Sequence, residues 1–240
     1  MSVLFPKRRD GTSGLVTLPG RDPQNDWQGF VSHEDLPRCL NPEEGYFGTA
    51  NEDLNRYGRV NPINMPMGPY RADRIDALLE QSDQFTPSDM FGMHFDVYSL
   101  QAEGFMKILR PLLPDTPQGR TLAGWDLCYS ADSKGAFLFE KVYEALYVEV
   151  FGKNGFGGDV TQYLAGETGI FCDFYYNFDR VLLSDDSAWF GGESREAIYK
   201  RVAEEALQVS PRSWGEVRRV VMSHLLLGGK LPAFLGFDRG

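Results

Sequence analysis

The pattern of apolar and polar positions changes near residue 71. Residues 1–45 show little periodicity and are rich in Gly, Pro, Asp and Arg, which predicts extended loops and short strands. From Arg71 on, apolar residues recur at helical spacing. One face of "RADRIDALLEQ" carries Ile75, Leu78 and Leu79. We therefore expect an α+β chain that is mostly helical, with a few strands among residues 1–60.

The next segment, "TPSDMFGMHFDVYSLQAEGFMKILRPLL", opens with a strong helix start signal. Thr86 is the expected N-cap, Pro87 suits the first helical position, and Asp89 stands where a capping-box acid belongs. Pro111 and Pro114 limit the end of this helix, since proline is not tolerated in a helix interior. The pattern predicts one long helix.

Three more helices are predicted farther along the chain. The first runs from Lys134 to about Phe151 and is followed by the Gly-rich break "GKNGFGGD". The second begins after Ser194 as N-cap, and the third covers "SWGEVRRVVMSHLLLG", with Ser213 as a possible cap and Gly228-Gly229 as its end. We divide the chain into an irregular segment, 1–60, and a mainly helical segment, 61–240, which together form one incomplete domain.

Charge and composition argue against several classes of function. The 240 residues carry a net charge of −10, which argues against a nucleic-acid partner because phosphate contacts need clustered Lys and Arg. No apolar run reaches the roughly 20 residues of a membrane span. The start "MSVLFPKRRDG" has the reverse of the secretory order, so no signal peptide is expected. The three cysteines, Cys39, Cys128 and Cys172, are expected to be buried free thiols.

The chain contains none of the self-sufficient catalytic signatures: a Gly-x-Ser-x-Gly elbow, a phosphate loop, His-Glu-x-x-His or Cys-x-x-Cys. Of the three histidines, His33, His94 and His224, the last two fall within predicted helices, where a half-buried structural role is favoured. Trp27 and Trp125 are predicted to be packing anchors. The acidic pair Asp185-Asp186 indicates a loop or cap, with a cation site as the alternative.

An ordered set of motifs does carry information: "DWQGF", "NPEEGYFGTANE", "YRADRIDALLEQ" and "AGWDLCYSADSKGAFLFEKVYEAL". Their order and spacing resemble the penicillin acylase (penicillin amidase) family of N-terminal-nucleophile hydrolases, which includes acyl-homoserine-lactone acylases. The similarity extends over nearly the whole chain. It implies a hydrolase of linear amides, with a small-molecule amide as substrate and a four-layer αββα sandwich as the complete fold.

The resemblance also assigns roles to residues. Members are cut into a small and a large chain, and the first residue of the large chain, a Ser, is nucleophile and, through its α-amino group, base. An Asn side-chain amide helps to hold the oxyanion, and this Asn matches Asn51. An Arg that orients the machinery matches Arg71, with Arg74 as the alternative if the register slips by one turn.

The residues themselves leave other interpretations open. Asn51 could be a turn or helix cap. Arg71 could be a solvated helix-start residue or an ion-pair partner of Asp73 or Asp76. No cofactor is predicted. A structural calcium is known in the family near the positions of Asn61, Asn64 and Asp53, but the spacing differs here and the ligands are not carried over.

No residue in 1–50 fits the nucleophile, because Ser2 matches a much later part of the family's large chain. We therefore expect an internal segment that lacks the Ser, is inactive alone, and needs a complementary chain that carries the nucleophile. The alternatives are a non-catalytic remnant or helical binding module of the family, and an unrelated helical protein. Family members are often periplasmic, and the compartment of this chain is left open.

Overall fold

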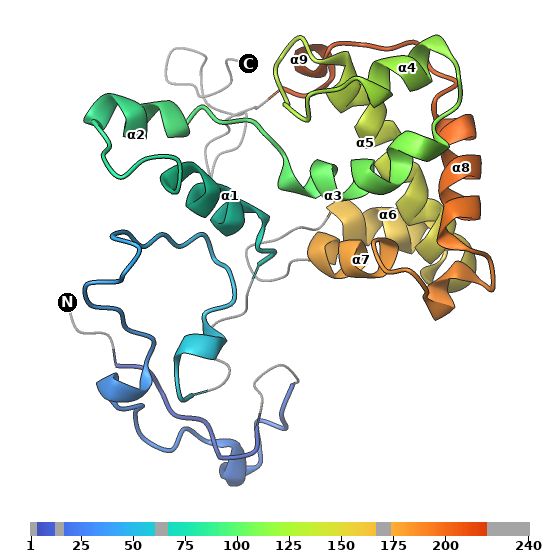
Figure 1. Ribbon diagram of the computed structural model, residues 1–240. Coiled ribbons are helices and arrows are strands. Elements are labelled where there is room, and N and C mark those ends of the chain that lie inside the picture. The colour runs from blue at the N-terminus through green and yellow to red at the C-terminus, as the bar shows by residue number, and fades with distance from the viewer. Residues whose placement is uncertain (1–3, 13–16, 61–66, 167–173, 220–240) are drawn as a thin grey trace, which may run out of the picture. The chain divides into compact units, whose positions relative to one another are not determined.

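The computed structural model describes residues 4–12, 17–60, 67–166 and 174–219 (Figure 1). The chain divides into two compact units. One unit contains residues 1–95 together with 163–180, and the other contains residues 96–162 together with 181–240. The division falls within two helices, α6 (Gly158–Gly166) and α7 (Phe174–Leu182). The predicted boundary near residue 60 stays a prediction.

The described residues among the first 60 form loops with three short 3-10 turns: η1 (Pro23–Asn25), η2 (His33–Asp35) and η3 (Asn55–Tyr57). The predicted strands are reduced, within the described part, to one isolated antiparallel bridge between Pro6 and Phe30. Backbone hydrogen bonds extend this pairing on either side, from Gln28 N to Lys7 O and from Val31 N to Phe5 O, both at 2.8 Å. Pro6 has no N–H to give, which limits the ladder at its centre.

Two helices follow in the same unit. α1 (Tyr70–Leu79) confirms the helix predicted from Arg71. α2 (Pro87–Met93) begins as predicted, with Thr86 as N-cap and a complete capping box to Asp89. The prediction of one long helix was wrong, because α2 ends at Met93 and a separate helix, α3 (Leu100–Leu109), begins after Ser99.

Two features separate α2 from α3. Ser99 takes an extended conformation and accepts a hydrogen bond from the N–H of Ala102, so it caps α3. Tyr98 forms an antiparallel bridge with Cys128, which fixes the chain before α3 in an extended form. The bridge joins positions that are far apart in sequence, so the local helical pattern could not reveal it.

The second unit is built around α5 (Lys134–Tyr147), which contacts α4 (Pro117–Ala123), α8 (Arg195–Ala206) and α9 (Trp214–Val217) (Figure 1). A further 3-10 turn, η4 (Arg110–Leu112), follows α3 directly, and another, η6 (Ala188–Phe190), precedes α8. The fully buried side chains at the centre of this unit include Phe105, Phe139, Leu146 and Tyr199. Apolar burial of this extent is the main stabilising contribution to the unit.

α5 does not stop where the Gly-rich segment was expected to break it. The helix continues as a π-helical stretch, η5 (Val148–Phe156), and ends at Gly157, whose φ is +84°. Within η5, Glu149 pairs with Lys153 and with Arg201 of α8. Burial raises the pKa of Glu149, but the hydrogen bonds from these two cations outweigh burial and lower it below its usual value. The pairing therefore ties η5 to α8 through a charged carboxylate.

The helix after Ser194 is confirmed as α8. The Ser213 prediction is confirmed at its start, where Ser213 and Glu216 form a capping box, but α9 is a single turn and Arg218 is already extended. Its predicted end at Gly228-Gly229 lies outside the described residues, as do His224 and Cys172. Among the described helices, none has the length and apolar character to cross a membrane.

Several burial predictions need correction. Cys39 is exposed rather than buried, and Cys128 is half-buried. His94 is exposed at the end of α2, because the helix stops one residue before it. Trp125 is a packing anchor as predicted, with 6% of its surface exposed, whereas Trp27 is 61% exposed and lies under the guanidinium of Arg8.

Candidate functional site

The two residues singled out from sequence meet directly. Arg71, in the first turn of α1, donates hydrogen bonds from Nη2 to the side-chain Oδ1 of Asn51 and to the backbone oxygen of Ala50, each at 2.8 Å. The pairing involves Arg71 and not Arg74. Within the described residues Arg71 forms no ion pair with Asp73 or Asp76, so that interpretation of Arg71 is wrong.

The Arg71 contact fixes which way the Asn51 amide faces. A guanidinium has donors only, so the atom that it meets must be the carbonyl oxygen of the amide. The NH₂ group of Asn51 therefore points away from Arg71. A neutral donor held in one orientation is what stabilisation of a developing oxyanion requires.

The backbone at Asn51 is in the left-handed region, with φ +67°. Asn tolerates this region better than other non-glycine residues, because its short polar side chain can bond locally. Asn51 is neither the N-cap of η3, which is Leu54, nor that of α1, which is Pro69. The helix-cap interpretation therefore does not hold for these two elements.

Further hydrogen bonds hold the backbone at Ala50 and Asn51. The N–H of Met67 donates to the backbone oxygen of Asn51 at 2.7 Å, and the N–H of Ala50 donates to Glu52 Oε2 at 2.6 Å. Ala50 itself is buried. Sequence reasoning missed both Met67 and Glu52, because neither residue carries a local signal of this role.

Acidic side chains surround this part of α1. The pKa of Asp76 is raised by burial and by the negative charges of Asp73, Glu80 and Glu52. These carboxylates lie on or close to the helix that carries the cationic Arg71. Close packing continues at Gly48, where an added Cβ would lie 3.1 Å from Ile75 Cγ2.

A second interaction anchors the start of α1. The hydroxyl of Tyr70 donates to Oδ2 of Asp179 at 3.1 Å, and Asp179 is fully buried. The Tyr70 ring meets Tyr176 edge-on, and Gly68 lies so close to Tyr176 that an added Cβ would be 3.1 Å from its ring. These contacts join α7 to the residues beside Arg71, 109 positions away in sequence.

Of the positions near the calcium of the family, Asp53 is the one that the structure describes. Asp53 directs Oδ1 to the N–H of Asn55 at 2.9 Å and so closes a turn. No group of three or more His, Cys, Asp or Glu side chains in the described ranges is placed to hold a metal ion. Asn61 and Asn64 lie outside the described residues.

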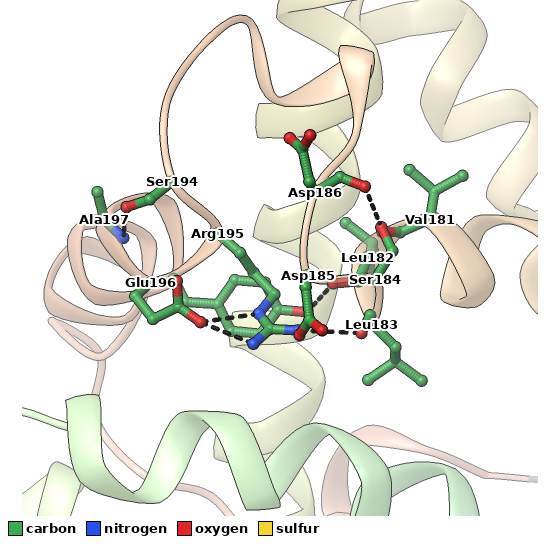
Figure 2. Close-up of polar contacts among 11 residues, drawn as sticks. Val181, Leu182, Leu183, Ser184, Asp185, Asp186, Ser194, Arg195, Glu196 and Ala197 are labelled. Atoms are coloured by element: carbon green, nitrogen blue, oxygen red, sulfur yellow. Dashed lines mark hydrogen bonds and ion pairs between the residues drawn. The ribbon is translucent and has the colours of Figure 1, made fainter.

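The acidic pair Asp185-Asp186 belongs to a loop in the other unit. Figure 2 shows Arg195 directed at this loop: Nη1 donates to Asp185 Oδ1 at 2.9 Å and to the backbone oxygen of Leu183 at 3.1 Å. Arg195 also pairs with Glu196 at 2.7 Å. Since the exposed Asp185 carboxylate already pairs with the half-buried guanidinium of Arg195, the loop interpretation fits the geometry.

Comparison with known proteins identifies the class to which this chain belongs. The chain is a member of the penicillin amidase family, whose model matches residues 1–240. The resemblance inferred from the motifs is therefore confirmed. This is the family whose motifs led to the choice of Asn51 and Arg71 as candidate site residues.

Individual relatives support the same placement. Penicillin acylase 2 proenzyme of a Pseudomonas species is 26% identical over 94% of this chain. Acyl-homoserine lactone acylase QuiP of Pseudomonas aeruginosa is 29% identical over 63% of the chain, and QuiP of Pseudomonas fluorescens is 28% identical over 61%. The chain spans 30% of the length of the first relative and 20% of the length of the other two.

Proposed function

We propose that this chain provides the oxyanion-stabilising part of a penicillin-acylase-type hydrolase that cleaves a linear amide into an acyl group and an amine. The observation that carries the proposal is the Arg71–Asn51 hydrogen bond, which holds the Asn51 amide oxygen and leaves its NH₂ group facing away from Arg71. Family membership supports the reaction class.

The proposed chemistry assigns each group one task. A serine nucleophile attacks the substrate carbonyl carbon, and the carbonyl oxygen gains negative charge as the tetrahedral intermediate forms. Asn51 donates an N–H to that oxygen. Arg71 does not contact the substrate; it orients Asn51, and its charge-assisted hydrogen bond to Oδ1 polarises the amide and makes the N–H a stronger donor.

The nucleophile belongs to the proposal as well. In an enzyme of this type the α-amino group of the first-residue Ser accepts the proton from its own hydroxyl. We infer that this Ser is supplied by polypeptide other than residues 1–240, on a complementary chain, and that the 240 residues alone do not turn over substrate. The assembled enzyme would then form the αββα sandwich of which this chain is one part.

The first test is the denatured intact mass of the native protein together with whatever co-purifies with it. A larger precursor, or a tightly bound second chain that begins with Ser, is the expected result. The second test is Asn51→Ala in that assembled enzyme, which should lower kcat about 10²–10³-fold with an unchanged unfolding temperature. A 27.1 kDa chain without a companion and without acylation by amide substrates would point instead to a non-catalytic binding module.

A further inference from the structure

The turn that carries Asn51 is held at the residue before it. Ala50 is buried, and both of its backbone polar groups are bonded to side chains: its N–H to Glu52 and its C=O to Arg71. The turn is therefore held at both polar groups of Ala50, by Arg71 at the C=O and by Glu52 at the N–H. The family motif drew attention to Asn51 and Arg71 and said nothing of Glu52.

The conformation of Asn51 needs such support. A non-glycine residue at φ +67° occupies a sparsely populated region, and it persists there only when its surroundings fix it. Met67 holds the Asn51 carbonyl and Arg71 holds its side chain, but neither of them fixes the peptide N–H of Ala50. The 2.6 Å hydrogen bond to Glu52 Oε2 supplies that remaining constraint.

We propose that Glu52 is a positioning residue: by accepting the Ala50 N–H, its carboxylate keeps Asn51 in the left-handed conformation, with Oδ1 on Arg71 and the NH₂ group facing away from Arg71. The conformational part of this proposal rests on geometry alone. Its consequence for catalysis rests on the proposed function.

A measurement on the 240-residue chain tests the conformational part without any activity. Asparagine is labelled with ¹³C and ¹⁵N, and the Asn51 signals are assigned by their loss in Asn51→Ala. Glu52→Ala should move the Asn51 Cα and Cβ shifts away from left-handed values and broaden the side-chain NH₂ signal. Glu52→Gln, which keeps an acceptor oxygen, should retain the wild-type shifts. Wild-type shifts in Glu52→Ala would overturn the proposal.

Two further variants make the result specific. Glu43→Ala removes an exposed carboxylate from the same loop and should leave Asn51 unchanged. Glu52→Asp keeps the charge but withdraws the oxygen by one methylene, so it should resemble Glu52→Ala. It also provides a second reading if Glu52→Ala fails to fold. A wild-type spectrum for Glu52→Asp together with an altered one for Glu52→Gln would mean that charge, not the hydrogen bond, matters, and would overturn the proposal.

The consequence for catalysis is tested in the assembled enzyme by a double-mutant cycle. Glu52→Ala should lower kcat about tenfold with KM nearly unchanged, and should have no further effect in an Asn51→Ala background, because residues that act as one unit are not additive. An equal loss in both backgrounds would overturn the role through Asn51. If Asn51→Ala itself left kcat unchanged, the proposed function would fail while the spectra would still decide the role of Glu52.

Discussion

The hydroxyl of Tyr70 donates a hydrogen bond to the fully buried carboxylate of Asp179. Tyr70 directly precedes Arg71, the arginine that holds Asn51. Burial and the negative charge of Asp179 raise the pKa of Tyr70 well above its ordinary value, so the phenol stays protonated and remains a donor. The first residue of α1 is therefore fixed to α7 by a bond that pH changes in the physiological range do not break.

This relationship predicts the effect of Tyr70→Phe. The substitution keeps the ring and its edge-on contact with Tyr176 but removes one donor from a buried carboxylate, which should lower the free energy of unfolding by about 1–3 kcal/mol. Denaturant titration provides the measurement. Tyr163→Phe removes a hydroxyl from a ring that is 64% exposed and should have little effect. Equal values for the two variants would contradict the anchoring role of Tyr70.

A second prediction separates the two arginines of α1 that the motif could not separate. Because Arg71 bonds Asn51, Arg71→Ala should lower kcat of the assembled enzyme about 10–100-fold, as expected when a catalytic group loses its orientation. Arg74→Ala is the matched control on the same helix and should stay near wild type. Steady-state kinetics on variants of verified stability gives the comparison. A larger loss with Arg74→Ala would show that the motif was matched in the wrong register.

Local signals predicted the helix starts well. The capping box at Thr86 and the serine caps at positions 194 and 213 lie where expected, because each depends on side chains within three residues of the helix start. The break between α2 and α3 depends on the bridge between Tyr98 and Cys128, and no local pattern contains that pairing.

The difference between local signals and contacts that are distant in sequence also applies to the candidate site. Asn51 and Arg71 could be selected because the family motif places them, and the structure brings them into contact. Asp179 could not be selected, since its partner Tyr70 lies 109 positions earlier and only the folded unit joins them. Glu52 carries no signal of its own, because an acid in a loop is usually solvated.

A third prediction concerns the close contact between Trp125 and Gly135. A Cβ on residue 135 would lie 2.3 Å from Cγ of the buried Trp125 indole. Gly135→Ala should therefore destabilise the chain by about 1–3 kcal/mol, despite the better helix propensity of Ala. Gly124→Ala is the control, since its new Cβ would be 3.5 Å from the nearest atom. Thermal unfolding measures both, and an unchanged or higher unfolding temperature for Gly135→Ala would contradict the contact.

The last prediction concerns Glu140 of α5, which accepts a hydrogen bond from the Tyr129 hydroxyl at 2.7 Å. Burial raises the pKa of this carboxyl above its ordinary value of 4.5, and the negative charge of Glu144 adds to the rise. The hydrogen bond from Tyr129 and the positive charges of Arg218 and Lys141 oppose the shift without cancelling it. The folded chain therefore binds this proton more tightly than the unfolded chain.

The sign of the pH dependence follows from the raised pKa. Protonated Glu140 favours folding fully below pH 4.5, and this contribution is lost as the pH rises through the higher pKa of the folded state. Glu140→Gln removes the titration but keeps an oxygen that can accept from Tyr129. Relative to wild type, the variant should gain stability between pH 4 and pH 7, as measured by denaturant titration at each pH. The same change at the exposed Glu205 serves as the control. A stability difference between Glu140→Gln and wild type that is constant with pH would contradict the raised pKa of Glu140.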